Sequence, residues 1–158
     1  MFIVSHNSIE KSNKFLEELA AIEEEILQDL GLTYRALDIA SEDLGLPAFR
    51  KIDLEAWLPG HGRFGEVTST SNCLDWQASR LGIQYKDEDG TIHYAHTLNG
   101  TALAVPRVIM ALIETHQNGD VVKLPSALHN YFGSSVLSGL PRCWRYSPSQ
   151  KIPGVFDF

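Results

Sequence analysis

The sequence has little cysteine, more acid than base, and no long hydrophobic run. Its 158 residues include two cysteines, Cys73 and Cys143, which are too few for a disulfide framework or a cysteine-ligated zinc site, so we expect two reduced thiols. Basic residues number 13 and acidic residues 20, which gives a formal net charge of −7. Because phosphate contacts supply much of the affinity of nucleic-acid-binding domains, we do not expect this chain to hold RNA through an overall positive field.

Membrane-spanning and targeting patterns are also missing from the sequence. No apolar run has the length of a transmembrane helix, and the first residues have neither a signal-peptide layout nor the Arg-rich, acid-poor character of a transit peptide. We therefore expect no membrane partner and recognise no targeting segment. Hydrophobic residues make up 44% of the chain and charged residues 21%, which are values typical of one globular domain with its own core.

The spacing of apolar residues predicts an α+β fold in which helices flank an antiparallel sheet. A helix is expected over residues 8–30, with Gly31 as its stop. We interpret the acids of the first helix as a solvated face: Glu17, Glu18, Glu23, Glu24 and Glu25. Strands are expected at residues 1–4, 34–39, 51–58 and 65–72, and a hairpin at residues 82–97. Residues 134–158 are expected to form an extended or disordered tail.

Residues 94–114 are the most informative stretch, because they predict a strand that turns through Asn99 and Gly100 directly into a helix. The helix would bury one stripe made of Val105, Val108, Ile109, Leu112 and Ile113. The residues alone leave two interpretations open. Thr101 and Arg107 could receive an anion at the helix start, or they could be an ordinary N-cap and a solvated surface residue.

Three strings in this chain resemble the seryl-tRNA synthetases, a family of class II aminoacyl-tRNA synthetases. They are RKIDLEAWLPG at residues 50–60, FGEVTSTSNCLDWQ at residues 64–77 and HTLNGTALAVPR at residues 96–107. The last of them is similar to the third signature motif of class II enzymes. The strings stand in the family's order, and the likeness is closest to its bacterial and mitochondrial branch. The resemblance implies that residues 1–133 are the C-terminal part of a class II catalytic domain.

The resemblance also implies a reaction and its participants. Serine would be activated with ATP and Mg²⁺ to seryl-adenylate and transferred to tRNA(Ser), by an enzyme that is a homodimer at full length and is mitochondrial or cytoplasmic. The residues that match ATP-binding positions are Glu66, Val67, Thr68, Ser69 and Arg107, and Arg107 is also the catalytic candidate. Glu66 and Ser69 would meet the magnesium of ATP, and Asn99 and Thr101 would contact serine.

The spacing of Glu66 and Ser69 sets a structural condition on this interpretation. Residues i and i+3 of a regular strand point to opposite faces, so a β-bulge or a strand end is needed to bring both side chains to one ligand. Without the resemblance, the same residues would be an ordinary polar strand face, with Asn99 as a turn residue and Thr101 as a cap.

The resemblance finally implies an incomplete active site. The arginine and glutamate of the family's second motif precede the position that matches Met1, so we expect this chain to have weak or no activity alone. One alternative is a non-catalytic, synthetase-like interaction protein that binds a full-length paralogue. Another is that the sequence is a piece of an ordinary enzyme.

Overall fold

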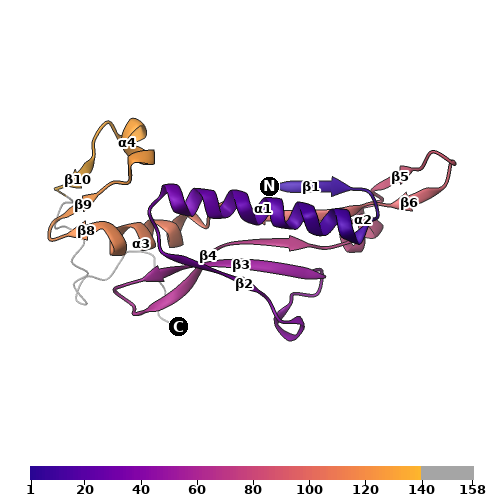
Figure 1. Ribbon diagram of the computed structural model, residues 1–158, viewed down its shortest axis with the longest axis horizontal. Helices are drawn as coiled ribbons and strands as arrows, with labels where there is room; N and C mark the ends of the chain where they lie inside the picture. Colours follow the sequence, from indigo (N-terminus) through magenta and orange to yellow (C-terminus); the bar gives the residue numbers. More distant parts are fainter. Residues whose placement is uncertain (140–158) are drawn as a thin grey trace, which may run out of the picture.

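The computed structural model describes residues 1–139, in which one antiparallel sheet of five strands forms the centre (Figure 1). Its order is β1-β7-β4-β3-β2. The strands are β1 (Phe2–Ser5), β2 (Tyr34–Asp38), β3 (Arg50–Leu58), β4 (Arg63–Asn72) and β7 (His96–Thr101). The predicted α+β class with an antiparallel sheet is confirmed.

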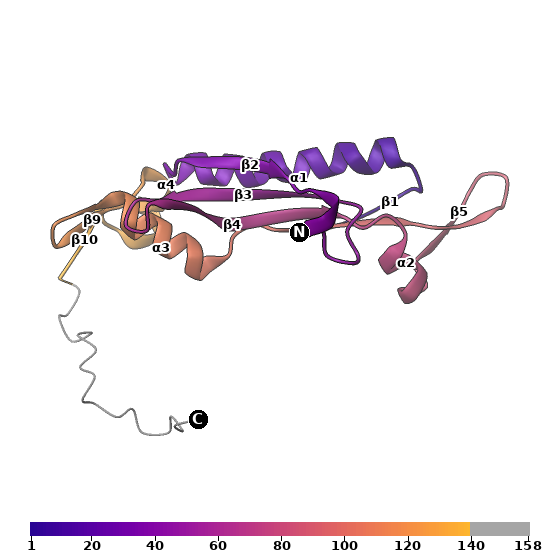
Figure 2. The same cartoon turned by 90° about the horizontal axis from the view of Figure 1, so that it is seen from below.

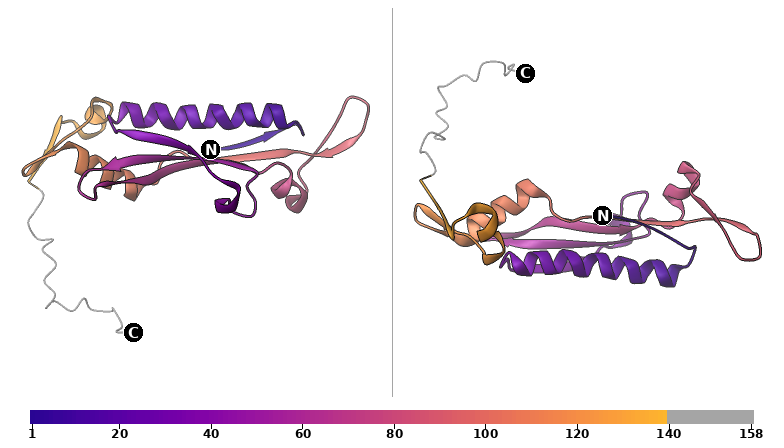
Figure 3. Two further views of the ribbon diagram at one scale, coloured as in Figure 1. Left: turned by 60° about the horizontal axis from the view of Figure 1, so that its bottom comes forward. Right: turned by 90° about the horizontal axis from the view of Figure 1, so that it is seen from above.

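The long helix α1 (Ile9–Asp29) covers one face of this sheet, as Figures 2 and 3 show. It begins at Ser8, whose hydroxyl accepts a hydrogen bond from the Lys11 amide at 3.4 Å, and Gly31 follows its end with φ of 64°. The buried stripe of α1 contains Leu16, Leu19, Ala20 and Leu27. Glu23 lies in the same stripe with a relative exposure of 0%, so its assignment to a solvated face was wrong.

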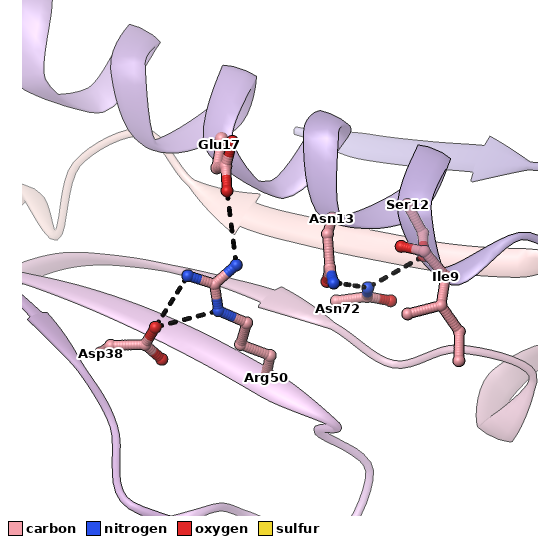
Figure 4. Close-up of polar contacts among 7 residues, drawn as sticks. All are labelled: Ile9, Ser12, Asn13, Glu17, Asp38, Arg50 and Asn72. Carbon is pink, nitrogen blue, oxygen red and sulfur yellow. Dashed lines mark hydrogen bonds and ion pairs between the residues drawn. The ribbon is translucent and has the colours of Figure 1, made fainter.

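Polar contacts attach the first half of α1 to the sheet (Figure 4). The side-chain amide of Asn72 donates to Ser12 Oγ at 3.1 Å and to Asn13 Oδ1 at 3.2 Å. Nearby, Arg50 binds Asp38 at 2.7 Å and Glu17 at 3.5 Å, which links β3 to β2 and to α1. These contacts fix α1 relative to the strands beneath it.

The helix α3 (Val105–His116) packs against strands β3 and β4. Two predictions made for this part of the chain were wrong. Asn99 and Gly100 do not form a turn, because they are paired residues of β7, and the cap position of α3 is Ala104 instead of Thr101. The local turn signal of Asn-Gly is overridden by the backbone ladder to β4. The predicted stripe is also only partly buried: Val108 lies in the core and Leu112 packs against it, whereas Val105, Ile109 and Ile113 are exposed. Ala111, which is outside the predicted stripe, is fully buried.

The remaining elements extend from the two ends of the sheet. At one end are α2 (Trp76–Leu81) and the predicted hairpin, β5 (Gln84–Lys86) and β6 (Ile92–Tyr94), which projects outward (Figure 1). Between β2 and β3 lies the short helix η1 (Ser41–Asp43). At the other end, α4 (Ser126–Phe132) accompanies a small sheet of β8 (Gln117–Asn118), β9 (Val121–Lys123) and β10 (Val136–Ser138).

Strand β10 pairs with β9, so residues 136–138 belong to a sheet, within the range expected to be a tail. Residues 140–158, including Cys143, lie outside the described residues, and the rest of the predicted tail with them. Among the helices of residues 1–139, none is long and apolar enough to cross a membrane.

Candidate active site

Strand β4 contains one more residue than the part of β3 that it pairs with. Leu54 pairs with Thr68, whereas the next residue of β3, Glu55, pairs with Glu66. Val67 therefore has no partner position and forms a β-bulge. The side chain of Val67 is 1% exposed and packs in the hydrophobic core.

The bulge places Glu66 and Ser69 on the same face of the sheet. Ser69 lies opposite Asp53 and Glu66 lies opposite Glu55. Asp53 and Glu55 are two residues apart on β3 and so point to one face, and residues directly across a ladder share a face. The condition that the sequence set for Glu66 and Ser69 is therefore met, on the face that α1 does not cover.

The ladder between β4 and β7 brings the two serine-site candidates to this same face. Thr101 pairs with Ser69, and Asn99 pairs with Ser71. Because paired residues of neighbouring strands lie side by side, Asn99, Thr101 and Ser69 form one polar row. Thr101 is exposed and Asn99 is half-buried, so a ligand on this face could reach both.

Arg107 lies in the first turn of α3 and its guanidinium approaches Glu66. Nη2 of Arg107 lies 3.5 Å from Oε1 of Glu66. The two side chains are 48% and 34% exposed, and an ion pair so exposed contributes little to stability. Both residues line a cavity of about 180 Å³, which Arg63 and Met110 also border. The cavity thus presents two cationic side chains beside one carboxylate, which suits a ligand that carries phosphate and a metal cation.

Contacts at both ends of α3 hold it against the β3–β4 hairpin. The carbonyl of the bulged residue Val67 accepts a hydrogen bond from the Ala104 amide at 2.8 Å, just before α3 begins. Near the other end, the Glu114 carboxylate accepts the Gly60 amide at 2.8 Å and lies 2.6 Å from Nδ1 of His61. The bulge at Val67 therefore has two effects: it orients Glu66, and it anchors α3, the helix that carries Arg107.

A second cavity of about 310 Å³ opens beside Asn99. Lys51, Ser71 and Gln77 contribute polar groups to its lining. The Lys51 ammonium lies 2.8 Å and 2.9 Å from the two oxygens of Asp53, so its charge is partly balanced. The cavity thus combines these polar groups with an apolar wall to which Pro47 and Ala48 contribute.

Cys73 also borders the second cavity, and its environment argues against a nucleophile. The Asn99 amide donates to Cys73 Sγ at 3.5 Å, but burial has the larger effect and raises the pKa of the thiol above its usual value. A neutral thiol is a weak nucleophile. Cys73, which is 3% exposed, is therefore a packing residue.

Two of the proposed ATP-binding residues can contribute only through their backbone. The side chains of Val67 and Thr68 are 1% and 0% exposed, and both point into packed surroundings. Thr68 faces α1, since it neighbours Ser69 in the regular part of β4.

Sequence reasoning missed four polar residues that line the two cavities: Lys51, Arg63, Ser71 and Gln77. Alternation along strands could have found two of them, because Lys51 shares a face with Asp53, and Ser71 with Ser69. Arg63 follows a turn and Gln77 lies in a helix that was not predicted, so no local pattern indicated them.

The donor set fits magnesium only if a ligand supplies most of the coordination. Within residues 1–139 there is no cluster of three or more His, Cys, Asp or Glu side chains that could hold a metal ion. Glu66 and Ser69 offer a carboxylate and a hydroxyl on one face. Magnesium is often bound by one or two protein oxygens together with substrate phosphates and water, and Glu66 and Ser69 could supply those protein oxygens.

Comparison with known proteins defines the class of this chain. A family model described as the tRNA synthetase class II core domain (G, H, P, S and T) matches residues 1–116, and the chain belongs to this family. Within the class, its relatives are serine--tRNA ligases. The mitochondrial serine--tRNA ligase of Mus musculus is 50% identical over 135 residues, which are 85% of this chain and 26% of that protein. The serine--tRNA ligase of Rubrobacter xylanophilus is 54% identical over 129 residues, or 81% of this chain and 30% of the relative.

A solved structure agrees with these relatives. The seryl-tRNA synthetase from Pyrococcus horikoshii complexed with ATP superimposes with a TM-score of 0.82 at 43% identity, covering 87% of this chain and 31% of that one. The cytoplasmic enzyme of Naegleria fowleri in complex with AMP gives 0.80 at 33% identity. The chain thus spans about a quarter to a third of the length of these proteins.

Proposed function

We propose that this chain forms the C-terminal part of the catalytic domain of a serine--tRNA ligase, which activates serine with ATP and transfers it to tRNA(Ser). One observation carries the proposal: the β-bulge and the β4–β7 register gather Glu66, Ser69, Asn99 and Thr101 on one face, with Arg107 beside them. The names of the relatives and the ATP and AMP in their solved structures support this assignment.

At the nucleotide end, Arg107 would bind ATP by stacking on adenine and donating to phosphate oxygens, since a guanidinium is planar, charged and forked. Glu66 would then leave its contact with Arg107 and bind the Mg²⁺ of ATP, together with the Ser69 hydroxyl. Bound Mg²⁺ would neutralise phosphate charge. The contribution of this chain is mainly to position the reactants and to stabilise charge.

At the amino-acid end, Asn99 and Thr101 would hold the serine substrate. An amide and a hydroxyl can each exchange hydrogen bonds with the substrate hydroxyl, and a site built for that hydroxyl rejects analogues that lack it. The row from Glu66 through Ser69 and Thr101 to Asn99 would align the serine carboxylate with the α-phosphate of ATP.

The activity of the chain alone would be weak, because it supplies only part of a catalytic surface. Of the full-length relatives it covers about a quarter to a third. Strand β1 lies at the edge of the five-stranded sheet, and its Phe2 and Val4 are 54% and 52% exposed. An apolar edge strand of this kind favours pairing with further polypeptide. In the complete enzyme we expect that polypeptide, a homodimer and tRNA contacts to come from outside this chain.

ATP-dependent stabilisation of the chain tests the nucleotide site. Binding at 100 times the dissociation constant would raise the free energy of unfolding by about 2.7 kcal/mol. We expect Mg-ATP to raise the melting temperature of the wild type, and Arg107→Ala to abolish the shift. Arg80→Ala is the matched control, because Arg80 stacks on Trp76 at 3.5 Å on α2, away from the site.

Three outcomes separate the candidate functions. A shift that Arg107→Ala removes and Arg80→Ala retains supports the nucleotide site. A folded chain without any shift that binds a full-length paralogue would favour the non-catalytic interaction protein. Serine-dependent ATP–pyrophosphate exchange at the rate of a full-length relative would contradict the weak activity of the chain alone.

The proposal includes the cellular compartment, which is mitochondrial or cytoplasmic. A mitochondrial location is supported by the name of the Mus musculus relative at 50% identity, and a cytoplasmic one by bacterial relatives such as that of Rubrobacter xylanophilus at 54%. Microscopy of the tagged protein, expressed from its complete gene, decides between them.

A further inference from the structure

A buried carboxyl lies directly behind the row of serine-site residues. Glu23, in the buried stripe of α1, has a relative exposure of 0% and faces the back of β7 at Gly100. Among residues 1–139, neither of its carboxylate oxygens has a hydrogen-bond partner. A buried carboxylate without partners is costly, so this position calls for an explanation.

The close fit of Glu23 against β7 depends on the missing side chain of Gly100. A Cβ atom on Gly100 would lie 2.8 Å from Glu23 Oε1 and 3.1 Å from Thr70 Oγ1. The two oxygens therefore occupy the space just behind the backbone that joins Asn99 to Thr101. Nothing larger than glycine fits between the carboxyl and the strand.

Two threonine hydroxyls of β4 stand between Glu23 and the backbone of β7. Thr70 Oγ1 donates to the Asn99 carbonyl at 3.1 Å, and Thr68 Oγ1 donates to the Thr101 carbonyl. The Thr68 hydroxyl also lies close enough to Glu23 to interact with its carboxyl. Each hydroxyl has one proton to donate, so each has a choice between a β7 carbonyl and the carboxylate.

We propose that Glu23 is a positioning residue whose protonation state controls how Thr68 and Thr70 hold the Asn99–Thr101 segment of β7. A protonated Glu23 donates its own O–H to a threonine oxygen, and both threonine hydroxyls remain bonded to the β7 carbonyls. An ionised Glu23 can only accept, so it competes with those carbonyls for the hydroxyl protons. Loss of the proton then loosens β7 from β4 behind the site.

The electrostatic surroundings place this change near neutral pH. Burial raises the pKa of Glu23 to about 7, while the Thr68 hydroxyl and the Met1 ammonium just before β1 lower it in part, and Asp53 on β3 raises it slightly. Strand β4 faces Glu23 with the neutral Thr68 and Thr70, and β7 faces it with Gly100. The titratable residue of β7, His96, contacts Ser12 at the other end of α1.

The inference extends the proposed function, because it rests on Asn99 and Thr101 as the serine contacts. A strand loosened at these two residues would hold the substrate hydroxyl less firmly. Serine binding would therefore weaken as the pH rises through the pKa of Glu23, while the nucleotide end at Arg107 would be less affected.

Amide hydrogen exchange of residues 96–101 in the full 158-residue chain tests the inference without any ligand. The pKa of Glu23 is about 7 when β7 is paired with β4, and it would have the ordinary value of 4.5 in the locally opened state from which the amides exchange. Protection of β7 should therefore fall about 30-fold between pH 5.5 and 8, after correction for intrinsic exchange. Glu23→Gln, a neutral group of the same shape that can donate, should keep the protection high at both pH values.

Two further variants complete the test. Glu25→Gln makes the same change at an exposed position of α1 and should leave the pH dependence intact. Thr70→Val removes one of the hydroxyls while keeping the shape, and should reduce the pH dependence. Protection of β7 that does not depend on pH in the wild type, or the same dependence in Glu23→Gln, would overturn the proposal. If Glu23→Gln does not fold, titration of the Glu23 carboxyl by NMR in the wild type gives the answer, and a midpoint below pH 5 would overturn it.

Failure of the proposed function gives a different result. If the protection of β7 depends on pH as expected but the chain binds neither Mg-ATP nor serine, the role of Glu23 is supported and the proposed ligase site is contradicted. A chain that binds both equally well at pH 5.5 and 8, with unchanged β7 protection, would retain the site and contradict the role of Glu23.

Discussion

Helix α1 packs on the sheet with two buried polar groups at its interface, one with its hydrogen bonds formed and one without. Near the start of the helix, the Asn72 amide donates to Ser12 and Asn13, its oxygen accepts the Leu74 amide, and His96 contacts Ser12. Three turns further on, Glu23 is equally buried, yet neither of its oxygens has a partner within the described residues.

The difference lies in the chemistry of the groups at each contact. The first contact centres on the Asn72 side-chain amide, which has no titratable proton and whose hydrogen bonds to Ser12, Asn13 and Leu74 are all formed, so it fixes the position of α1. The second places an acid among oxygens, and only its protonated form can donate. Equal burial therefore produces a rigid contact at one end of the interface and a titratable one at the other.

The largest effect should come from the titratable contact. Because its pKa is raised from 4.5 to about 7, Glu23 contributes stability that is fully present below pH 4.5 and is lost as the pH rises through 7. The difference of about 2.5 units corresponds to a loss of about 3 kcal/mol in the free energy of unfolding. Urea unfolding at a series of pH values measures it, and Glu23→Gln should remove the decline. An equal decline in Glu23→Gln would assign it to another group.

Removal of the rigid contact should cost somewhat less and should not depend on pH. Asn72→Ala removes the donor to Ser12 Oγ and leaves the Leu74 amide without its acceptor, and Leu74 adopts a φ of 44°, which is unfavourable for a residue with a side chain. We expect a loss of about 2 kcal/mol in urea unfolding. The exposed Asn118→Ala serves as control, and a loss below 0.5 kcal/mol for Asn72→Ala would show that the contact is not rigidly held.

A methyl group added between β7 and Glu23 should have a smaller effect. Gly100→Ala places a Cβ atom 2.8 Å from Glu23 Oε1 and should cost about 1 kcal/mol, because a close-packed contact must shift. Gly45→Ala is the control, since its Cβ would meet only Pro47 at 3.9 Å. In a Glu23→Ala background the cost of Gly100→Ala should fall, because only the longer contacts of the added Cβ atom with Thr70 Oγ1 at 3.1 Å and Met1 Cε at 3.2 Å remain. An unchanged cost would mean that these two groups, and not Glu23, cause it.

The smallest effect should come from His96, with the opposite sign. Burial is the main cause that lowers the pKa of His96 below 6.5, while Asp75 and the Ser8 backbone raise it in part. Stability from this group is therefore present above pH 6.5 and is lost as the pH falls through the lowered pKa. His96→Gln should steepen the net decline with rising pH that Glu23 causes, which unfolding curves between pH 5 and 7 would detect. A shallower decline would contradict the sign.

Sequence patterns predicted most of the fold because they depend on period and local stops. The helix from Ser8, its end at Gly31 and the strand at residues 51–58 were all visible in the sequence, and all are confirmed. The same period could have identified Glu23, because it follows Leu19 by four residues and precedes Leu27 by four. Its charge led to the wrong assignment.

Other features depended on contacts between distant residues. Asn99 and Gly100 look like a turn locally, and only the ladder to Ser71 and Thr70 makes them a strand. The exposure of Val105 and Ile109 on α3 follows from the position of the helix at the end of the sheet, which no local period encodes. The candidate site residues came from a motif resemblance, and their convergence on one face required the register.

The β-bulge at Val67 has a consequence for how this chain tolerates changes in length. A regular strand can place two residues on one face only when an odd number of residues separates them, whereas Glu66 and Ser69 share a face with two residues between them. Deletion of Val67 would leave Glu66 and Ser69 on their common face, about 7 Å apart along a regular strand. It would also remove the carbonyl that accepts the Ala104 amide. A single-residue deletion here would therefore keep Glu66 and Ser69 in place but detach the start of α3, which carries Arg107. The length of β4 thus sets the position of α3, a helix that lies far from it in sequence.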